Sequence, residues 1–206
     1  MMLSNVFAKT LRDRWMGWAI AVVSLTLFVL LGMSVYRDID LSSFTDLPDA
    51  YLVLMGIGED VDVGGLAIGV IQGTYGALIL AALALSMGAS TIAGEESSGT
   101  IGLLLGNPKS RTHVLVSKAA SMVFLTALSA LVMWLMVYPI AAILDVAIGG
   151  LEVGALTLHI FVNALFYGFL AMVIGAWTGN KGAGWGAAAG VLILSLFAVG
   201  VLPLIK

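Results

Sequence analysis

Five long apolar stretches divide this chain and constrain its fold more than any other feature. Crossing a hydrocarbon layer of about 30 Å takes about 20 helical residues, and each stretch is long enough. The stretches lie near 15–35, 66–93, 114–144, 156–177 and 182–204. The second and third exceed the minimum length, and Pro139 is expected to kink or end the third. The sequence therefore predicts an all-α membrane protein with five transmembrane helices.

The composition supports this class and excludes several others. Hydrophobic residues make up 61% of the chain and charged residues only 10%, whereas a soluble domain carries about 25% charged residues. The chain has no cysteine, which excludes disulfides and cysteine-based zinc or thiol chemistry. A Walker lysine loop, a nucleophile elbow and an HExxH motif are also absent from the sequence. We therefore predict no catalytic residue, no metal site and no cofactor in this chain.

The positions of the charged residues predict how the chain is oriented. Lysine and arginine cluster before the first stretch, between the second and third, and between the fourth and fifth, whereas the other connections are mainly acidic. The positive-inside rule places the basic connections in the cytoplasm. We therefore expect a multi-pass protein of a prokaryotic plasma (inner) membrane with a cytoplasmic N-terminus. The basic residues concerned are Lys9, Arg12, Arg14, Lys109, Arg111, Lys118 and Lys181.

Residues 1–14 combine apolar and basic side chains. Leu3, Phe7 and Leu11 recur at helical spacing, with Val6 beside them. A short basic amphipathic helix of this kind lies in the plane of the membrane surface. We predict such an interfacial helix, and the alternative is an ordinary basic flank that anchors the first span.

The largest extracytoplasmic element is a loop over residues 36–65. Asp46 can cap a helix there, with Pro48 near its first turn. The apolar run 51–55 then stops at Gly56. This run either dips into the membrane surface or forms one buried turn of an acidic, solvated loop, and the sequence leaves both readings open.

A polar island between Gly94 and Lys118 interrupts the apolar pattern. Glu95 and Glu96 lie where a helix would begin, and the helix dipole favours carboxylates in a first turn by roughly 0.3–1 kcal/mol each. Residues 101–105 are apolar except for one glycine and continue this helix.

Two further signals end this helix and start the next. Gly106, Asn107 and Pro108 stop it, because glycine and asparagine tolerate left-handed geometry and proline blocks continuation. Ser110 or Thr112 then caps a helix that enters the third span. Residues 94–113 are therefore predicted to form a short helix, a sharp turn and a new helix, and the alternative is a merely solvated loop.

At these residues the chain resembles the ABC-2 type exporter permeases. That family shows a glutamate-rich start, a Gly-Thr, an aliphatic triplet, a proline, a Ser-Arg and a lysine in this order. The amphipathic start, the acidic outer loop and the order of spans match as well, so the resemblance covers essentially the whole chain. It is similar in particular to the antibiotic and multidrug exporter branch. The matching residues are Glu95, Glu96, Gly99, Thr100, Leu103, Leu104, Leu105, Pro108, Ser110, Arg111 and Lys118.

The resemblance implies a dimeric membrane core, made with a second permease copy or a homologous half. It also implies two cytosolic ATPase subunits that bind ATP and Mg, with residues 94–113 as the cytoplasmic coupling segment between spans two and three. No nucleic-acid partner is predicted. The family has six spans per half and five are found here, so the chain is truncated, lacks the sixth span, or has two spans merged in our reading.

Glycines and a few polar residues mark the spans. Two glycine ladders repeat every four residues and would let helix backbones approach closely, either within the subunit or at a moving or dimerising interface. Polar side chains within the spans are candidates for a transport pathway, but a lone histidine makes a poor metal site. The ladders are Gly65, Gly69, Gly73 and Gly182, Gly186, Gly190, and the pathway candidates are Gln72, His159 and Asn163.

These patterns predict the transmembrane subunit of an ATP-driven exporter. Its nearly charge-free spans suit a lipophilic or amphipathic cargo, such as a drug, an antibiotic or a lipid-like molecule. A secondary transporter is one alternative, but it would need buried ionisable relays, which the spans almost entirely lack. A membrane-embedded enzyme or a non-transporting scaffold subunit is the other.

Overall fold

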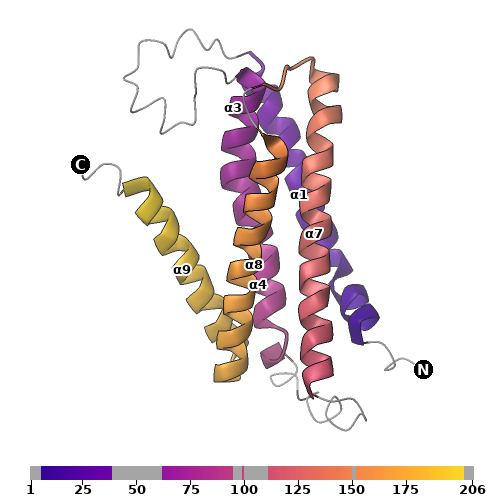
Figure 1. The fold of residues 1–206 in the computed structure, drawn as a ribbon, viewed down its shortest axis with the longest axis vertical. Coiled ribbons are helices and arrows are strands. Elements are labelled where there is room, and N and C mark those ends of the chain that lie inside the picture. Colours follow the sequence, from indigo (N-terminus) through magenta and orange to yellow (C-terminus); the bar gives the residue numbers. More distant parts are fainter. Residues whose placement is uncertain (1–5, 39–61, 95–98, 100–110, 150–151, 202–206) are drawn as a thin grey trace. The chain divides into compact units, whose positions relative to one another are not determined.

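The part of the chain that the structure describes is almost entirely helical. The computed structural model describes residues 6–38, 62–94, 99, 111–149 and 152–201 (Figure 1). Within these ranges five helical stretches are long and apolar enough to cross a membrane. This confirms the all-α membrane fold with five spans. The stretches are Val6–Tyr36, Val63–Ala89, Thr112–Leu144, Val153–Thr178 and Lys181–Ala198.

The second span is the one that departs from a regular α-helix. It consists of α3, the π-helical turn η2 and α4 in direct succession. A π-helical turn is wider than an α-helical one and appears mostly as a single turn inside a longer helix. The described elements are α1 (Val6–Tyr36), α3 (Val63–Val70), η2 (Ile71–Gly76), α4 (Ala77–Ala89), α7 (Arg111–Leu144), α8 (Val153–Thr178) and α9 (Lys181–Val201).

The chain divides into two compact units. The first comprises Met1–Gly17, Ala81–Thr126 and Asn163–Lys206, and the second comprises Trp18–Leu80 and Ala127–Val162. Helices α1, α4, α7 and α8 each contribute residues to both units, whereas α9 belongs to the first and α3 to the second.

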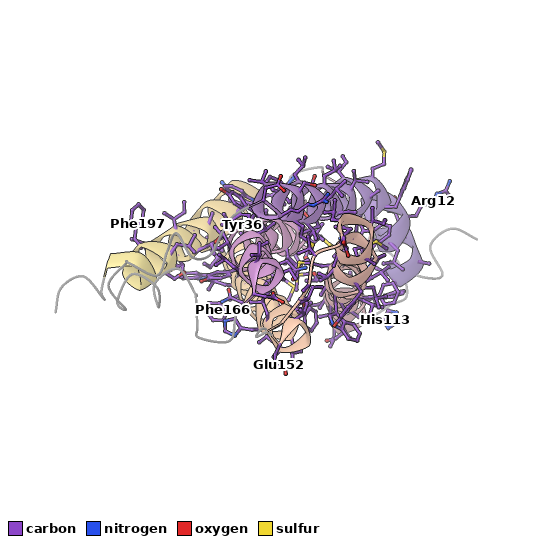
Figure 2. The ribbon with its side chains drawn as sticks, turned by 90° about the horizontal axis from the view of Figure 1, so that it is seen from above. Arg12, Tyr36, His113, Glu152, Phe166 and Phe197 are labelled. Atoms are coloured by element: carbon purple, nitrogen blue, oxygen red, sulfur yellow. The ribbon has the colours of Figure 1, made fainter. Side chains whose placement is uncertain are left out.

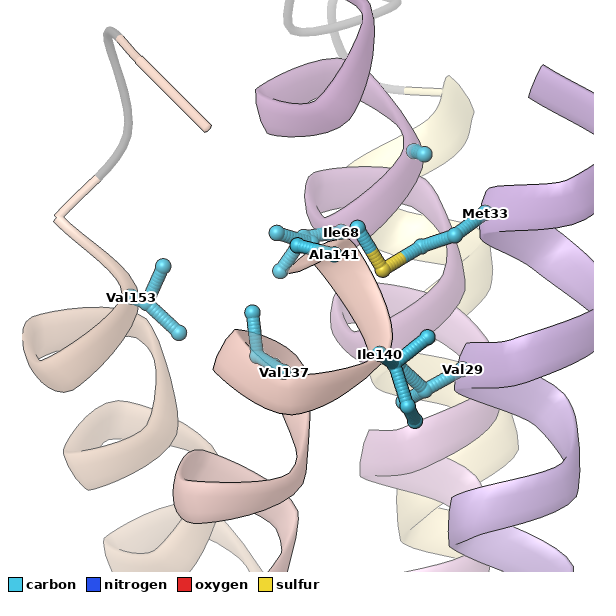
Figure 3. Close-up of a cluster of buried hydrophobic side chains, with 8 residues drawn as sticks. Val29, Met33, Ile68, Val137, Ile140, Ala141 and Val153 are labelled. Carbon is cyan, nitrogen blue, oxygen red and sulfur yellow. The ribbon is translucent and has the colours of Figure 1, made fainter. Parts of the chain in front are cut away.

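The core of the second unit is built from medium-sized apolar side chains. Figure 3 shows them converging from four helices. Side chains of this size can interdigitate as they do in a soluble core, and any void between them forfeits dispersion contacts. The cluster comprises Val29 and Met33 of α1, Ala67 and Ile68 of α3, Val137, Ile140 and Ala141 of α7, and Val153 of α8.

The core of the first unit is built from small residues instead. Alanines of α4, α8 and α9 pack there together with Leu85 and Tyr167. Glycine lets the helix backbones come together, since a methyl group added at Gly88 would overlap the carbonyl oxygen of Gly168. A methyl at Gly184 would lie 2.7 Å from the carbonyl oxygen of Ala171.

Helix α7 ends by a left-handed cap rather than at its proline. Pro139 lies inside the helix, which continues to Leu144, so the alternative that Pro139 ends the span is wrong. Asp145 has a φ of 55°, and the Val146 N–H donates to the carbonyl of Ala141 at 3.0 Å. This bond satisfies one of the carbonyls left without a partner in the last turn.

Two side chains cap the starts of other helices. Asp62 precedes α3, and its Oδ1 accepts from the Gly65 N–H at 2.7 Å. Asn180 precedes α9, and its Oδ1 accepts from the N–H groups of Gly182 at 2.8 Å and Ala183 at 3.2 Å. Each cap satisfies backbone donors that have no partner within the helix.

The predicted N-terminal helix and outer loop are covered only in part. Residues 6–14 are helical as expected, but they continue into the first span without a break at residue 15. Their placement in the membrane surface stays a prediction. The loop residues 39–61 lie outside the described residues, together with both readings of the run 51–55.

Candidate functional site

The coupling segment 94–113 belongs to the first unit and connects two of its helices. The chain departs at the end of α4 and returns as α7. Within the island, Gly99 is exposed with a φ of 69°, a conformation that favours glycine, and α7 begins at Arg111. The other predicted contact residues lie outside the described residues, and they are Glu95, Glu96, Thr100, Leu103, Leu104, Leu105 and Pro108.

Hydroxyl side chains close the end of α4. Ser90 donates to the carbonyl of Ser86 at 2.6 Å, and Thr91 Oγ1 donates to the carbonyl of Met87 at 2.9 Å. Both residues are buried. Thr91 lies two residues beyond the end of α4, so its carbonyl lies outside the helix and is available to a donor from another element.

Lys118 of α7 supplies such a donor. Its Nζ donates to the carbonyl oxygen of Thr91 at 2.7 Å, and only 9% of the lysine is exposed. A cation near the C-terminal end of a helix is favoured by the helix dipole, and a hydrogen bond from an ionised donor is stronger than a neutral one. The contact joins the end of α4 to the start of α7, across 27 residues of sequence.

Helix α1 reaches the same place with a second cation. Arg14 Nη2 donates to Ser90 Oγ. The beginning of α1 also contacts α7, where the rings of Phe7 and Phe124 meet edge to face at 5.9 Å and Ser121 Oγ lies 3.4 Å from the carbonyl oxygen of Phe7. We call Arg14, Ser90, Thr91 and Lys118 the root cluster, because it lies where the chain leaves α4 and where it returns as α7.

The root cluster can hold three helices together but contains no nucleophile with an activating base. Lys118 belongs to the predicted motif, whereas the sequence reasoning missed the parts played by Arg14, Ser90 and Thr91. The available signal was the placement of basic residues early in two helices, at the end where a third helix must leave its last carbonyls without partners.

The structure does not bring the three pathway candidates together. Gln72 is 1% exposed, and its Nε2 donates to the carbonyl of Met133 at 3.1 Å. Its Oε1 is buried without a hydrogen-bond partner among the described residues. His159 and Asn163 are exposed on α8. Gln72 therefore links η2 to α7 inside the second unit, while the other two face outward.

The glycine ladders do not make the close contacts within this chain. A methyl group added at Gly69, Gly73, Gly186 or Gly190 would meet nothing within 4 Å among the described residues. A four-residue step overshoots a helical turn by about 40°, so such a ladder drifts around its helix. In the second span this drift takes Gly65 from a buried position to an exposed one at Gly73.

The ladder position at Gly182 and the surface of α9 agree with this. A methyl at Gly182 would lie 3.2 Å from Asn180 Oδ1 of its own turn. Toward its end α9 exposes large apolar side chains, including Leu194 at 69% and Phe197 at 65%, and Figure 2 shows Phe197 projecting from the helix. Packing of these faces against another chain stays a prediction.

An apolar groove of about 270 Å³ lies in the second unit between α7 and α8. None of Gln72, His159 and Asn163 lines it. Thr157 is its hydroxyl-bearing residue, and that hydroxyl donates to the carbonyl of Val153 in its own helix. The groove is lined by Ala127, Ala130, Leu131, Trp134, Gly154, Thr157, Leu158 and Phe161.

Comparison with known proteins gives one match. A family model described as ABC-2 family transporter protein matches residues 4–205, which include all five spanning helices, the polar island and the root cluster. No curated protein and no solved structure matches the chain.

Proposed function

The chain belongs to the ABC-2 family of transporter proteins, and from this membership we propose that it is the permease subunit of an exporter. The family provides the membrane permease of an ABC transporter, and its partner is an ATP-binding subunit. The proposal adds the outward direction, a lipophilic or amphipathic cargo, and a second permease copy or homologous half. ATP and Mg would be bound by the partner subunit.

The proposed contact with that partner is the segment 94–113. A helix that starts at Glu95 and Glu96 would insert into a groove on the ATPase, with residues 103–105 packing it and Arg111 pairing with a glutamate or with the partner. A helix of about twelve residues is about 18 Å long and rigid, so it can transmit a rigid-body movement. The observation that carries this proposal is that both flanks of the segment are anchored in the root cluster.

The exposed side chains of the spans support the proposed class of cargo. The exposed side chains of the described spans are mainly large and apolar, on α1, α7, α8 and α9. Such walls offer no compensation for a desolvated charge, which costs many kcal/mol in an apolar medium. A lipophilic or amphipathic molecule fits them, and Gln72, His159 and Asn163 remain the candidates for contacting its polar group.

The test reverses the charge at both glutamates. Glu95→Lys with Glu96→Lys should leave the protein in the membrane but weaken ATPase binding and transport, because lysines in a first turn oppose the helix dipole. Membrane abundance, co-purification with the ATPase and vanadate-sensitive transport would be measured on the same preparation. The matched control is Glu59→Lys with Asp60→Lys, which reverses an adjacent acidic pair in the predicted outer loop.

The possible outcomes separate the alternatives. Full transport with intact ATPase association in the Glu95/Glu96 variant would refute the coupling role of the segment. Transport that persists under vanadate and follows an ion gradient would instead favour the secondary transporter. A loss of membrane abundance in this variant, but not in the control, would mean that the glutamates serve the fold.

A further inference from the structure

We propose that Lys118 and Arg14 are positioning residues that fasten both flanks of the coupling segment, so that α4, α7 and the start of α1 move as one body. The inference rests on the proposed function for what the movement achieves. The joint itself rests on the contacts of the root cluster and can be tested without the partner subunit.

Lys118 carries most of the argument. Moving a charged side chain out of water is costly unless it is paired and hydrogen-bonded, so packing alone would favour an apolar residue at this position. Here the ammonium group meets the carbonyl of Thr91, three residues before the polar island begins at Gly94. Lys118 itself lies in the second turn of α7, just after the coupling segment 94–113 ends. One side chain thus spans both flanks.

Arg14 adds an independent connection. It reaches from α1 to Ser90, whose hydroxyl already donates back to the carbonyl of Ser86 in α4. The guanidinium therefore binds a hydroxyl whose position is fixed by its own helix. A movement of the end of α4 is therefore transmitted to α1 through the Arg14–Ser90 bond and to α7 through the Lys118–Thr91 bond.

The mechanical consequence follows from where the joints lie. Without the contacts of Lys118 and Arg14, a force on the segment could displace one flank while the other stayed in place. A peptide connection alone leaves both flanks free to hinge. With these contacts, the two flanks keep a fixed separation. A displacement delivered by the ATPase is then shared by spans one, two and three.

The first experiment measures that separation directly. Spin labels on cysteines at Ile92 and Thr112, in the otherwise cysteine-free chain in lipid nanodiscs, report the distance between the flanks. The parent should give one narrow distribution. Lys118→Met should raise the population with separated flanks about tenfold, which corresponds to about 1.4 kcal/mol and to the loss of one charged hydrogen bond.

Three variants serve as references. Lys118→Arg keeps a cation and should retain most of the narrow distribution. Lys181→Met removes an exposed lysine at the start of α9 and should change nothing. Lys118→Gln keeps a donor without the charge and should broaden the distribution less than Lys118→Met. If Lys118→Met fails to accumulate in the membrane, the distance distribution of Lys118→Gln is used to test the proposal instead.

The second experiment adds the ATPase. Transport per ATP hydrolysed should fall several-fold in Lys118→Met and partly in Arg14→Met, while ATPase co-purification stays at the parent level. A narrow distribution and unchanged transport per ATP in Lys118→Met and Lys118→Gln would overturn the inference. A broadened distribution in a protein that never binds an ATPase would leave the joint standing and defeat the proposed function.

Discussion

The two units fill their cores with side chains of different size. In the first, small residues bring backbones into contact, as at Gly88 and Gly168, and polar side chains such as Lys118 bridge between helices. In the second, medium-sized apolar side chains interlock, as at Met33 and Ile68. In lipid, burying an apolar side chain gains little over exposing it, so close backbone approach and polar bonds specify helix contacts. The second unit has such contacts as well, since a methyl at Gly64 would overlap the carbonyl oxygen of Ala147 and Gln72 bonds to Met133. The first unit is the one that holds the flanks of the coupling segment.

The largest effect is expected where two backbones touch. Gly88→Ala should lower the thermal stability of the purified protein strongly, because the new methyl would overlap the carbonyl oxygen of Gly168. Overpacking of this kind costs about 1–3 kcal/mol and occasionally more. Thermal unfolding in detergent measures it, and Gly186→Ala is the matched control, since its methyl meets nothing within 4 Å.

This pair of variants can also contradict the comparison between the two units. Equal stability of Gly88→Ala and Gly186→Ala would show that backbone contact is not what holds α4 to α8. A Gly186→Leu chain that folds normally but no longer forms dimers would assign the ladder at Gly182, Gly186 and Gly190 to a contact with a second copy.

A smaller effect is expected for the polar link of the second unit. Gln72→Met keeps the shape of the side chain but removes the bond to the carbonyl of Met133. Interhelical hydrogen bonds in a membrane contribute about 0.6 kcal/mol on average, and the change also removes the unpartnered Oε1. The net loss of thermal stability should therefore be well below that of Gly88→Ala. A larger loss than Gly88→Ala would reverse the comparison between the units.

The smallest effect is expected from single cysteines at Asp60 and Lys109. Neither should change stability, because both lie in connections between spans. Membrane-impermeant thiol reagents should nevertheless label them from opposite sides of the membrane, as the positive-inside rule requires. Labelling of both cysteines from the same side would contradict the predicted topology.

The spans were predictable because length and apolarity determine them almost alone. The third was predicted at 114–144 and is observed at Arg111–Leu144, and the fourth was predicted at 156–177 and is observed at Val153–Thr178. The π-helical turn η2 was not predicted. The turn carries Gln72, Thr74 and Tyr75 between apolar flanks, but a few polar residues in an apolar span set no periodicity that marks a change of helical pitch.

Contacts between helices were less predictable. The regular ladder at Gly182, Gly186 and Gly190 predicted close helix contacts. The glycines that are in close contact, such as Gly88 and Gly168, show no regular spacing. A repeat identifies a face of a helix but not the neighbour that covers it. The root cluster was hidden for the same reason, since Arg14, Ser90 and Lys118 are remote in sequence and only the fold brings them together.

The short turn between α8 and α9 has a consequence for how the protein is made. Only Gly179 and Asn180 separate the two helices, and two extended residues reach about 7 Å, far less than the roughly 30 Å of a hydrocarbon layer. Helix α9 must therefore cross back in the direction opposite to α8. Its orientation therefore follows from that of α8, and we expect the two helices to enter the bilayer together as a hairpin during synthesis.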